Sequence, residues 1–137
     1  MNHLVIFDNE AVQALGDERH PKHKRVLAYV QVIATRRQRA MSIRALVPTS
    51  VRVEAGWDRT SAGWAFVDRL RVADVALDSA HANIAAAIRS SCDVSVADAH
   101  IGAAVETHRT DRISIVTSDP DDMRRVSAGA AFTIIAI

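Results

Sequence analysis

The amino-acid sequence predicts an α/β domain with a mainly parallel central β-sheet flanked by helices. Two observations carry this prediction. Short, largely apolar runs of strand length recur along the chain, which is typical of strands buried on both faces of a sheet. Longer segments with apolar residues at helical spacing separate these runs, and strands that alternate with helices favour parallel pairing through right-handed crossovers. A chain of 137 residues with 49% hydrophobic and 24% charged content fits one globular domain over residues 1–137.

Five runs are expected to form the strands. In chain order they span residues 4–7, 43–47, 72–77, 113–116 and 132–137. The first run ends abruptly at Asp8, the second at Pro48, and the fourth at the Thr117-Ser118-Asp119 turn. Because the helices between them are long enough to cross back over the sheet, all these carboxyl ends are expected at one edge.

The helices are expected between these strands. They span residues 9–15, 23–39, 61–70, 78–88 and 95–108, with two short ones after Pro48 and Pro120. Thr49 or Ser50 can cap the helix after Pro48, because short polar side chains accept hydrogen bonds from the first free amides of a helix. The helix over residues 95–108 opens with Ser95-x-x-Asp98, the pattern of a capping box.

Composition excludes several other classes of protein. The one cysteine, Cys92, excludes an intramolecular disulfide. No uncharged apolar run is long enough to span a membrane, and the N-terminus lacks the pattern of a signal peptide. We therefore expect a cytoplasmic protein. The formal net charge of +1 says nothing about partners, although the basic stretch at Arg36, Arg37 and Arg39 is either a solvated helix end or a surface that contacts RNA phosphates.

Carboxylates are expected at the carboxyl edge of the sheet. Asp8 directly follows the first strand and Asp119 the fourth. Asp98 shares the inward stripe of its helix with Ile101, and Glu54 belongs to a helix that begins at the same edge. Three of these acids alone also have a plainer interpretation: Asp98 as the third-position acid of a capping box, Asp119 as a helix cap, and Glu54 as a surface acid with Arg59 as a candidate partner.

Together the four acids indicate a cation site. Carboxylates that converge repel one another by at least about 1 kcal/mol per close pair, so they need protons or a cation. An oxygen-only set favours Mg²⁺ or Mn²⁺ over zinc. The six histidines show no HExxH motif and no paired spacing of metal ligands.

The ordered set of motifs resembles a known family. The matching segments are Val5-Ile-Phe-Asp8, Val53-Glu54, Val96-Ala-Asp98-Ala-His-Ile-Gly-Ala-Ala104 and Val116-Thr-Ser-Asp119-Pro-Asp-Asp122. In this order and spacing they are similar to PIN-domain ribonucleases, and most closely to the VapC-type toxins of bacterial type II toxin–antitoxin pairs. The resemblance spans almost the whole chain. It departs from the family at Asn9, where Thr or Ser is common, and at Arg59, which lies five residues after Glu54 instead of three.

The resemblance implies a PIN-like fold and hydrolysis of RNA phosphodiester bonds with Mg²⁺ or Mn²⁺. Asp8, Asp98 and Asp119 would hold the metal, and Glu54 would complete the catalytic set. Further candidates around them are Asn9, Thr117, Ser118 and either Asp121 or Asp122. The resemblance also implies a homodimer and a cognate VapB-type antitoxin whose C-terminal segment blocks the acidic groove.

Three other functions are alternatives for this sequence. A PIN-like domain that binds RNA or protein without cutting is the main alternative. A receiver-type signalling domain needs adjacent acids after the first strand and a lysine after a later one, and no lysine follows Lys24. A serine hydrolase is disfavoured because the chain has no GxSxG motif.

Overall fold

A five-stranded, wholly parallel β-sheet forms the centre of the computed structural model, which describes residues 2–39 and 41–137. The strand order is β3-β2-β1-β4-β5, and every pairing is parallel. The strands are β1 (His3–Phe7), β2 (Ile43–Pro48), β3 (Ala73–Val75), β4 (Arg112–Thr117) and β5 (Thr133–Ala136). The α/β class predicted from the sequence is confirmed.

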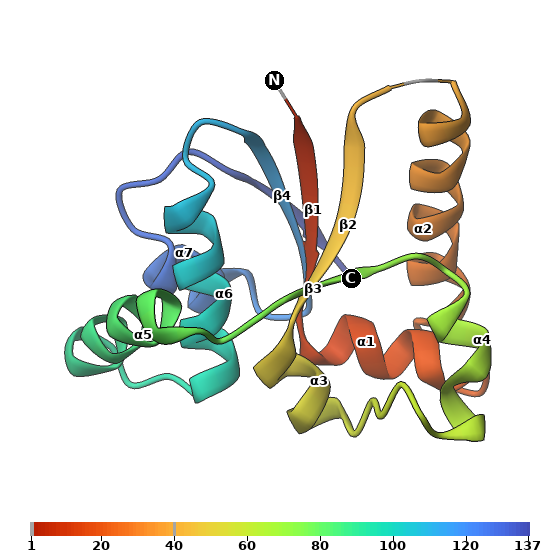
Figure 1. Cartoon of the computed structure of the whole chain (residues 1–137), viewed down its shortest axis with the longest axis horizontal. Coiled ribbons are helices and arrows are strands. Elements are labelled where there is room, and N and C mark those ends of the chain that lie inside the picture. The colour runs from red at the N-terminus through yellow and green to blue at the C-terminus, as the bar shows by residue number, and fades with distance from the viewer. Residues whose placement is uncertain (1, 40) are drawn as a thin grey trace.

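Helices cover both faces of this sheet. They are α1 (Asn9–Gly16), α2 (His23–Gln38), α3 (Thr49–Ala55), α4 (Ala65–Asp68), α5 (Ser79–Ser91), α6 (Val96–Thr107) and α7 (Pro120–Val126). Figure 1 shows α5, α6 and α7 on one side of the sheet and α1, α2 and α4 on the other, with α3 at the carboxyl ends of the strands. Within the described residues no helix has the length and apolar character needed to span a membrane.

The central strands β1 and β4 are buried on both faces. Ile6, Phe7 and Ile115 are fully buried in the core between the helix layers. Phe7 pairs with Val116 in the parallel register, and the amide of the next residue, Asp8, donates to the carbonyl of Val116 at 3.1 Å. This register brings Asp8 and the end of β4 side by side at the carboxyl edge.

The segment predicted as one helix over residues 61–70 is instead a 3-10 turn (Ala62–Trp64) followed by the four-residue α4. Tertiary contacts hold it in this bent form. Trp64 stacks on Trp57 with ring centroids 5.8 Å apart, and the Trp57 indole donates to Asp68 at 2.8 Å. The contacts of the tryptophan pair therefore determine the conformation of this segment more than its helical periodicity does.

The cap predicted for α3 is also wrong in detail. Pro48 takes the N-cap position, and Thr49 and Ser50 belong to the first turn of the helix. Their hydroxyls are used elsewhere: Thr49 Oγ1 accepts from the Leu77 amide at 3.1 Å, and Ser50 Oγ bonds to the ring of His100 at 2.6 Å. Contacts with other elements outweigh local capping here.

Helices α6 and α7 approach each other closely at Gly102. A Cβ atom at this position would lie 2.4 Å from the carbonyl oxygen of Val126 and 2.8 Å from Cδ1 of Ile88. Only glycine avoids this clash, so the glycine sets the spacing between the two helices.

Candidate active site

Asp8 is buried at the carboxyl edge and held by donors from two segments. It is 5% exposed and caps α1, with Oδ1 accepting from the Ala11 amide at 2.8 Å. Its other oxygen, Oδ2, accepts from Thr117 Oγ1 at 2.6 Å and from the Ser118 amide at 3.2 Å. Burial raises the pKa of Asp8, while the hydrogen bonds from Thr117, Ala11 and Ser118 oppose that shift.

Thr117 connects Asp8 to the start of α7. Its hydroxyl donates to Asp8 and accepts from the Asp119 amide at 2.9 Å. Asp119 is exposed and caps α7, where Oδ1 accepts from the Asp122 amide at 3.2 Å. Its carboxylate also lies against that of Asp122.

Asp98 lies in the first turn of α6 and is half-buried. Its amide donates to Ser95 Oγ at 3.0 Å, as the capping pattern predicts, while its carboxylate accepts no hydrogen bond from any residue that the structure describes. Burial raises the pKa of Asp98 to about 6, and the negative charges of Asp122, Asp8, Glu54 and Asp119 act in the same direction. The acids predicted from the sequence therefore lie near enough to Asp98 for their charges to raise its pKa.

The two further acids after Asp119 differ in their surroundings. The pKa of Asp122 is raised by partial burial and by its contact with Asp119. Asp121 is 92% exposed and pairs with Arg124 at 3.1 Å, while Asp122 pairs with Arg125 at 3.3 Å. Of the two alternatives left open by the sequence, Asp122 lies beside the other acids.

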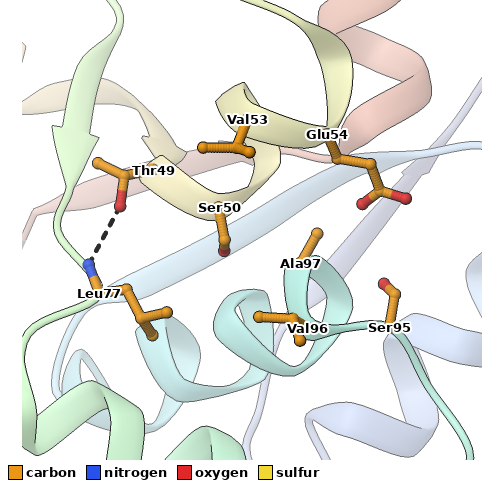
Figure 2. A pocket seen from close by; sticks show the side chains of 8 residues that line it. All are labelled: Thr49, Ser50, Val53, Glu54, Leu77, Ser95, Val96 and Ala97. Atoms are coloured by element: carbon orange, nitrogen blue, oxygen red, sulfur yellow. Dashed lines mark hydrogen bonds between the residues drawn. The ribbon is translucent and has the colours of Figure 1, made fainter.

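Glu54 stands beside a cavity of about 420 Å³ between α3 and the start of α6. The rest of the lining is largely apolar, with Val53, Leu77 and Val96 all exposed to solvent. Figure 2 shows the Glu54 carboxylate and the Ser95 hydroxyl on the same side of this cavity. An apolar surface thus adjoins the acidic one.

A buried pair ties the helices that carry Glu54 and Asp98. Ser50 on α3 and His100 on α6 are joined through Oγ and Nδ1 at 2.6 Å. Burial lowers the pKa of His100 to about 4, with a smaller contribution from His81, so the ring is neutral at pH 7. Sequence reasoning missed this pair because the two residues are 50 positions apart and no local spacing connects them.

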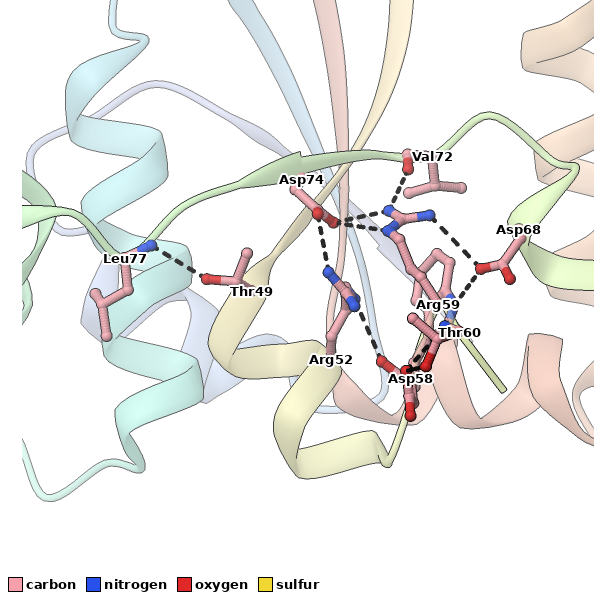
Figure 3. A network of polar contacts seen from close by, with 10 residues as sticks. Thr49, Arg52, Asp58, Arg59, Thr60, Asp68, Val72, Asp74 and Leu77 are labelled. Atoms are coloured by element: carbon pink, nitrogen blue, oxygen red, sulfur yellow. Dashed lines mark hydrogen bonds and ion pairs between the residues drawn. The ribbon is translucent and has the colours of Figure 1, made fainter. Parts of the chain in front are cut away.

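A network of ion pairs fixes α3 and the loop after it against β3 (Figure 3). Asp74 receives Arg52 at 2.8 Å and Arg59 at 2.7 Å, and Arg59 also lies 3.8 Å from Asp68. Glu54 is an exposed acid, but its predicted pairing with Arg59 is wrong, because Asp74 and Asp68 take up this guanidinium. Glu54 is left facing solvent at the cavity.

The remaining predicted residues lie differently. Asn9 is the first residue of α1, where its Oδ1 accepts from Gln13 at 3.2 Å. The arginines at positions 36, 37 and 39 stand at the C-terminal end of α2, which leads into the amino end of β2. They are thus at the opposite edge of the sheet from the acids (Figure 1), and the structure does not bring them into the acidic site.

The donor set suits a hard divalent cation. The converging groups are all carboxylates, the ligands that Mg²⁺ and Mn²⁺ prefer. Among the described residues no three Asp, Glu, His or Cys side chains are already arranged as ligands of one ion. The carboxylate of Asp98, which accepts no hydrogen bond from them, is the group best able to turn toward a cation.

Comparisons with known proteins relate this chain to others through its fold. No protein-family model and no curated protein matches the sequence. Among solved structures, VapBC2 from Rickettsia felis bound to a DNA fragment from its promoter has a TM-score of 0.63 at 9% identity, over 96% of this chain and 98% of that one. FitAB bound to an IR36 DNA fragment has a TM-score of 0.55 at 14% identity, over 95% and 94%. At these identities the likeness shows the fold, which is PIN-like.

Proposed function

We propose that this protein is a Mg²⁺- or Mn²⁺-dependent endoribonuclease, a toxin that a cognate antitoxin neutralises. The observation that carries the proposal is the convergence of charge on Asp98: burial and four neighbouring carboxylates raise its pKa to about 6. A cluster that disfavours its own ionisation is one that a divalent cation would stabilise. The PIN-like fold and the four sequence segments similar to VapC-type toxins support the choice of RNA as substrate.

Each acid has a distinct part in the proposed site. Asp98 would be the main ligand, since its carboxylate accepts no hydrogen bond from the described residues. Asp8 already accepts three hydrogen bonds, and a carboxylate has about four acceptor positions, so it would offer a single one. Asp119 would offer its second oxygen, with Asp122 beside it. Glu54, exposed at the edge of the cavity, would accept a proton from the attacking water or complete the shell.

A bound Mg²⁺ or Mn²⁺ would lower the pKa of a water molecule and stabilise negative charge on the phosphate. The rest of the chemistry depends on the chain. The Thr117 hydroxyl bonds to both Asp8 and the Asp119 amide, and so fixes their relative positions. Ser118 contributes its backbone amide, which donates to Asp8, rather than its hydroxyl. The Ser50–His100 bond holds α3 against α6, and so keeps Glu54 near Asp98.

The proposed partner is a VapB-type antitoxin that inserts a basic side chain among the acids. Such a side chain would neutralise the cluster as a cation does. The cavity beside Glu54, with exposed Val53, Leu77 and Val96, would take an apolar neighbour of that basic residue. A homodimer, as in the family that the sequence resembles, is proposed with it.

The test is cleavage of RNA by the purified protein. Cleavage is expected with Mg²⁺ or Mn²⁺ and absent in EDTA. Asp8→Asn and Asp98→Asn are each expected to lower the rate at least 100-fold, while Glu18→Gln, an exposed acid in the turn after α1, keeps it. Circular dichroism verifies that all three variants fold.

Two results would contradict the proposal. Full activity in EDTA would refute the role of the metal, and unchanged rates in both Asp variants would refute the site. RNA binding without any cleavage, with metal present, would favour the alternative of a PIN-like binding module.

A further inference from the structure

A second cavity lies on the α2 flank of the molecule, away from the acids. Its volume is about 370 Å³, within the range of about 300–1,000 Å³ typical of ligand sites. The C-terminal half of α2 forms one wall, and the turn between α4 and β3 forms the other. Arg37 from the helix and Arg69 and Arg71 from the turn line it, and no acidic residue does.

The three arginines of this cavity lack an ion-pair partner among the described residues, and Arg69 and Arg71 are exposed to solvent. None of the ion pairs between described residues includes Arg37, Arg69 or Arg71. Moreover, Nε of Arg37 is buried and has no hydrogen-bond partner among them. Buried donors are nearly always satisfied in folded proteins, so Nε of Arg37 is a donor without its usual acceptor, and it belongs to a side chain that lines the cavity.

The backbone at Arg71 supports the same conclusion. Its φ of 58° lies in the left-handed region, where glycine is favoured and other residues are uncommon. Such positions cluster at ligand sites, because a required side chain outweighs the conformational cost. Here the side chain kept at this cost is a guanidinium that lines the cavity.

We propose that this cavity binds the phosphoryl group of a nucleotide unit. Guanidinium groups match phosphate oxygens with paired hydrogen bonds. The combined positive charge of three guanidinium groups is greater than the charge that a single carboxylate ligand would neutralise. Val30, Ala34 and Leu70 supply an apolar floor for a ribose or base, and the amides of Gln31 and Gln38 can donate to or accept from it. The nucleotide unit is either free or part of an RNA chain.

The cavity carries the inference by itself, and only the case of an RNA chain rests on the proposed function. Of the predicted RNA contacts at Arg36, Arg37 and Arg39, only the one at Arg37 is kept in this proposal. Arg37 alone of these lines the cavity, and Arg36 lines a different one beside His3 and Arg112.

The experiment measures binding in EDTA, so cleavage plays no part in it. Adenosine 5′-monophosphate, citrate and a short single-stranded RNA are titrated by calorimetry at constant ionic strength. The variants are Arg37→Gln and Arg71→Gly, with Arg25→Gln as the control for net charge. Arg25 is an exposed residue of α2 that lines none of the cavities described above.

Wild-type protein is expected to bind the monophosphate, the RNA or both, with dissociation constants raised at least ten-fold in Arg37→Gln and Arg71→Gly and within two-fold in Arg25→Gln. Because glycine suits the backbone at position 71, Arg71→Gly is expected to keep or raise the melting temperature, which separates lost binding from lost folding. A response of the monophosphate alone assigns a free nucleotide, and a response of the RNA alone assigns a phosphate within the chain. The proposal is overturned if neither probe responds to the two variants, or if citrate binds as tightly as the monophosphate.

Discussion

Removing the charge of Asp98 is expected to stabilise the metal-free protein at pH 7. In the folded protein the pKa of this carboxyl is about 6, against 3.8 for an unperturbed group. An acid whose pKa is raised by folding binds its proton more tightly in the native state. The contribution of Asp98 to stability is therefore full below about pH 4 and is lost as the pH rises from there through 6. Asp98→Asn keeps the neutral form at every pH.

The magnitude follows from the shift and two corrections. A shift of about two units corresponds to at most about 3 kcal/mol, and solvent screening of a half-buried group reduces this to about 1.5 kcal/mol. Asp98 also interacts favourably with the N-terminus of α6, and losing that interaction costs about 0.5 kcal/mol. The net gain of about 1 kcal/mol raises the melting temperature by about 3–4 °C in a chain of this size.

The assay is thermal unfolding in EDTA from pH 4 to pH 8, followed by circular dichroism. The curves of wild type and Asp98→Asn should coincide near pH 4, separate between pH 4 and pH 6, and stay apart by a constant amount above pH 6, with the variant more stable. Glu18→Gln removes a charge from an exposed site and should follow the wild type throughout. A variant less stable than wild type at pH 7 would refute the repulsion between the carboxylates and leave Asp98 as a first-turn acid that interacts with the N-terminus of α6 alone.

Three other perturbations test the neighbouring structure. Thr117→Val removes the hydroxyl that donates to Asp8, so we expect the free energy of unfolding to fall by about 2 kcal/mol in chemical denaturation. The pKa of Asp8 should also rise further, as read from NMR titration of its carboxyl carbon. An unchanged denaturation midpoint would contradict the hydrogen bond. Gly102→Ala places a methyl group against Val126. The overpacking cost of up to about 3 kcal/mol exceeds the gain of about 1 kcal/mol in helix propensity, so the free energy of unfolding should fall by about 1–2 kcal/mol in the same assay. A more stable variant would show that the helices can separate freely. Mg²⁺ at ten times its dissociation constant should stabilise wild type by about 1.4 kcal/mol, and most of this effect should vanish in Asp98→Asn; equal shifts in both proteins would place the ion elsewhere.

The sequence was sufficient for the fold class and for the edge at which the acids lie. Apolar runs alternate with helical stripes, so parallel pairing follows from the connections alone. Asp8 and Asp119 directly follow strands, and the carboxyl ends of parallel strands meet at one edge. Local pattern thus predicts where these acids lie, because the backbone positions them.

Other features depend on which elements meet in space, and local pattern cannot supply that. The Ser50–His100 bond and the pairing of Arg59 with Asp74 join different elements through side chains with several possible partners. The same holds for the cavity of Arg37, Arg69 and Arg71, whose residues look like two separate solvated basic stretches in the sequence. The bent segment around Trp64 was mispredicted for the same reason.

The absence of a side chain at Gly102 has a consequence for which ion the acidic site would select. Mg²⁺ requires ligand distances of about 2.0–2.1 Å, whereas Ca²⁺ accepts about 2.3–2.6 Å and a looser shell. Asp98 is carried by α6, and Asp122 by the helix that touches Gly102 through the Val126 carbonyl. Progressively larger side chains at position 102 would therefore push α6 and α7 apart by increasing amounts. Each would widen the gap between these acids without altering a carboxylate, and so shift preference from the smaller cation toward the larger one.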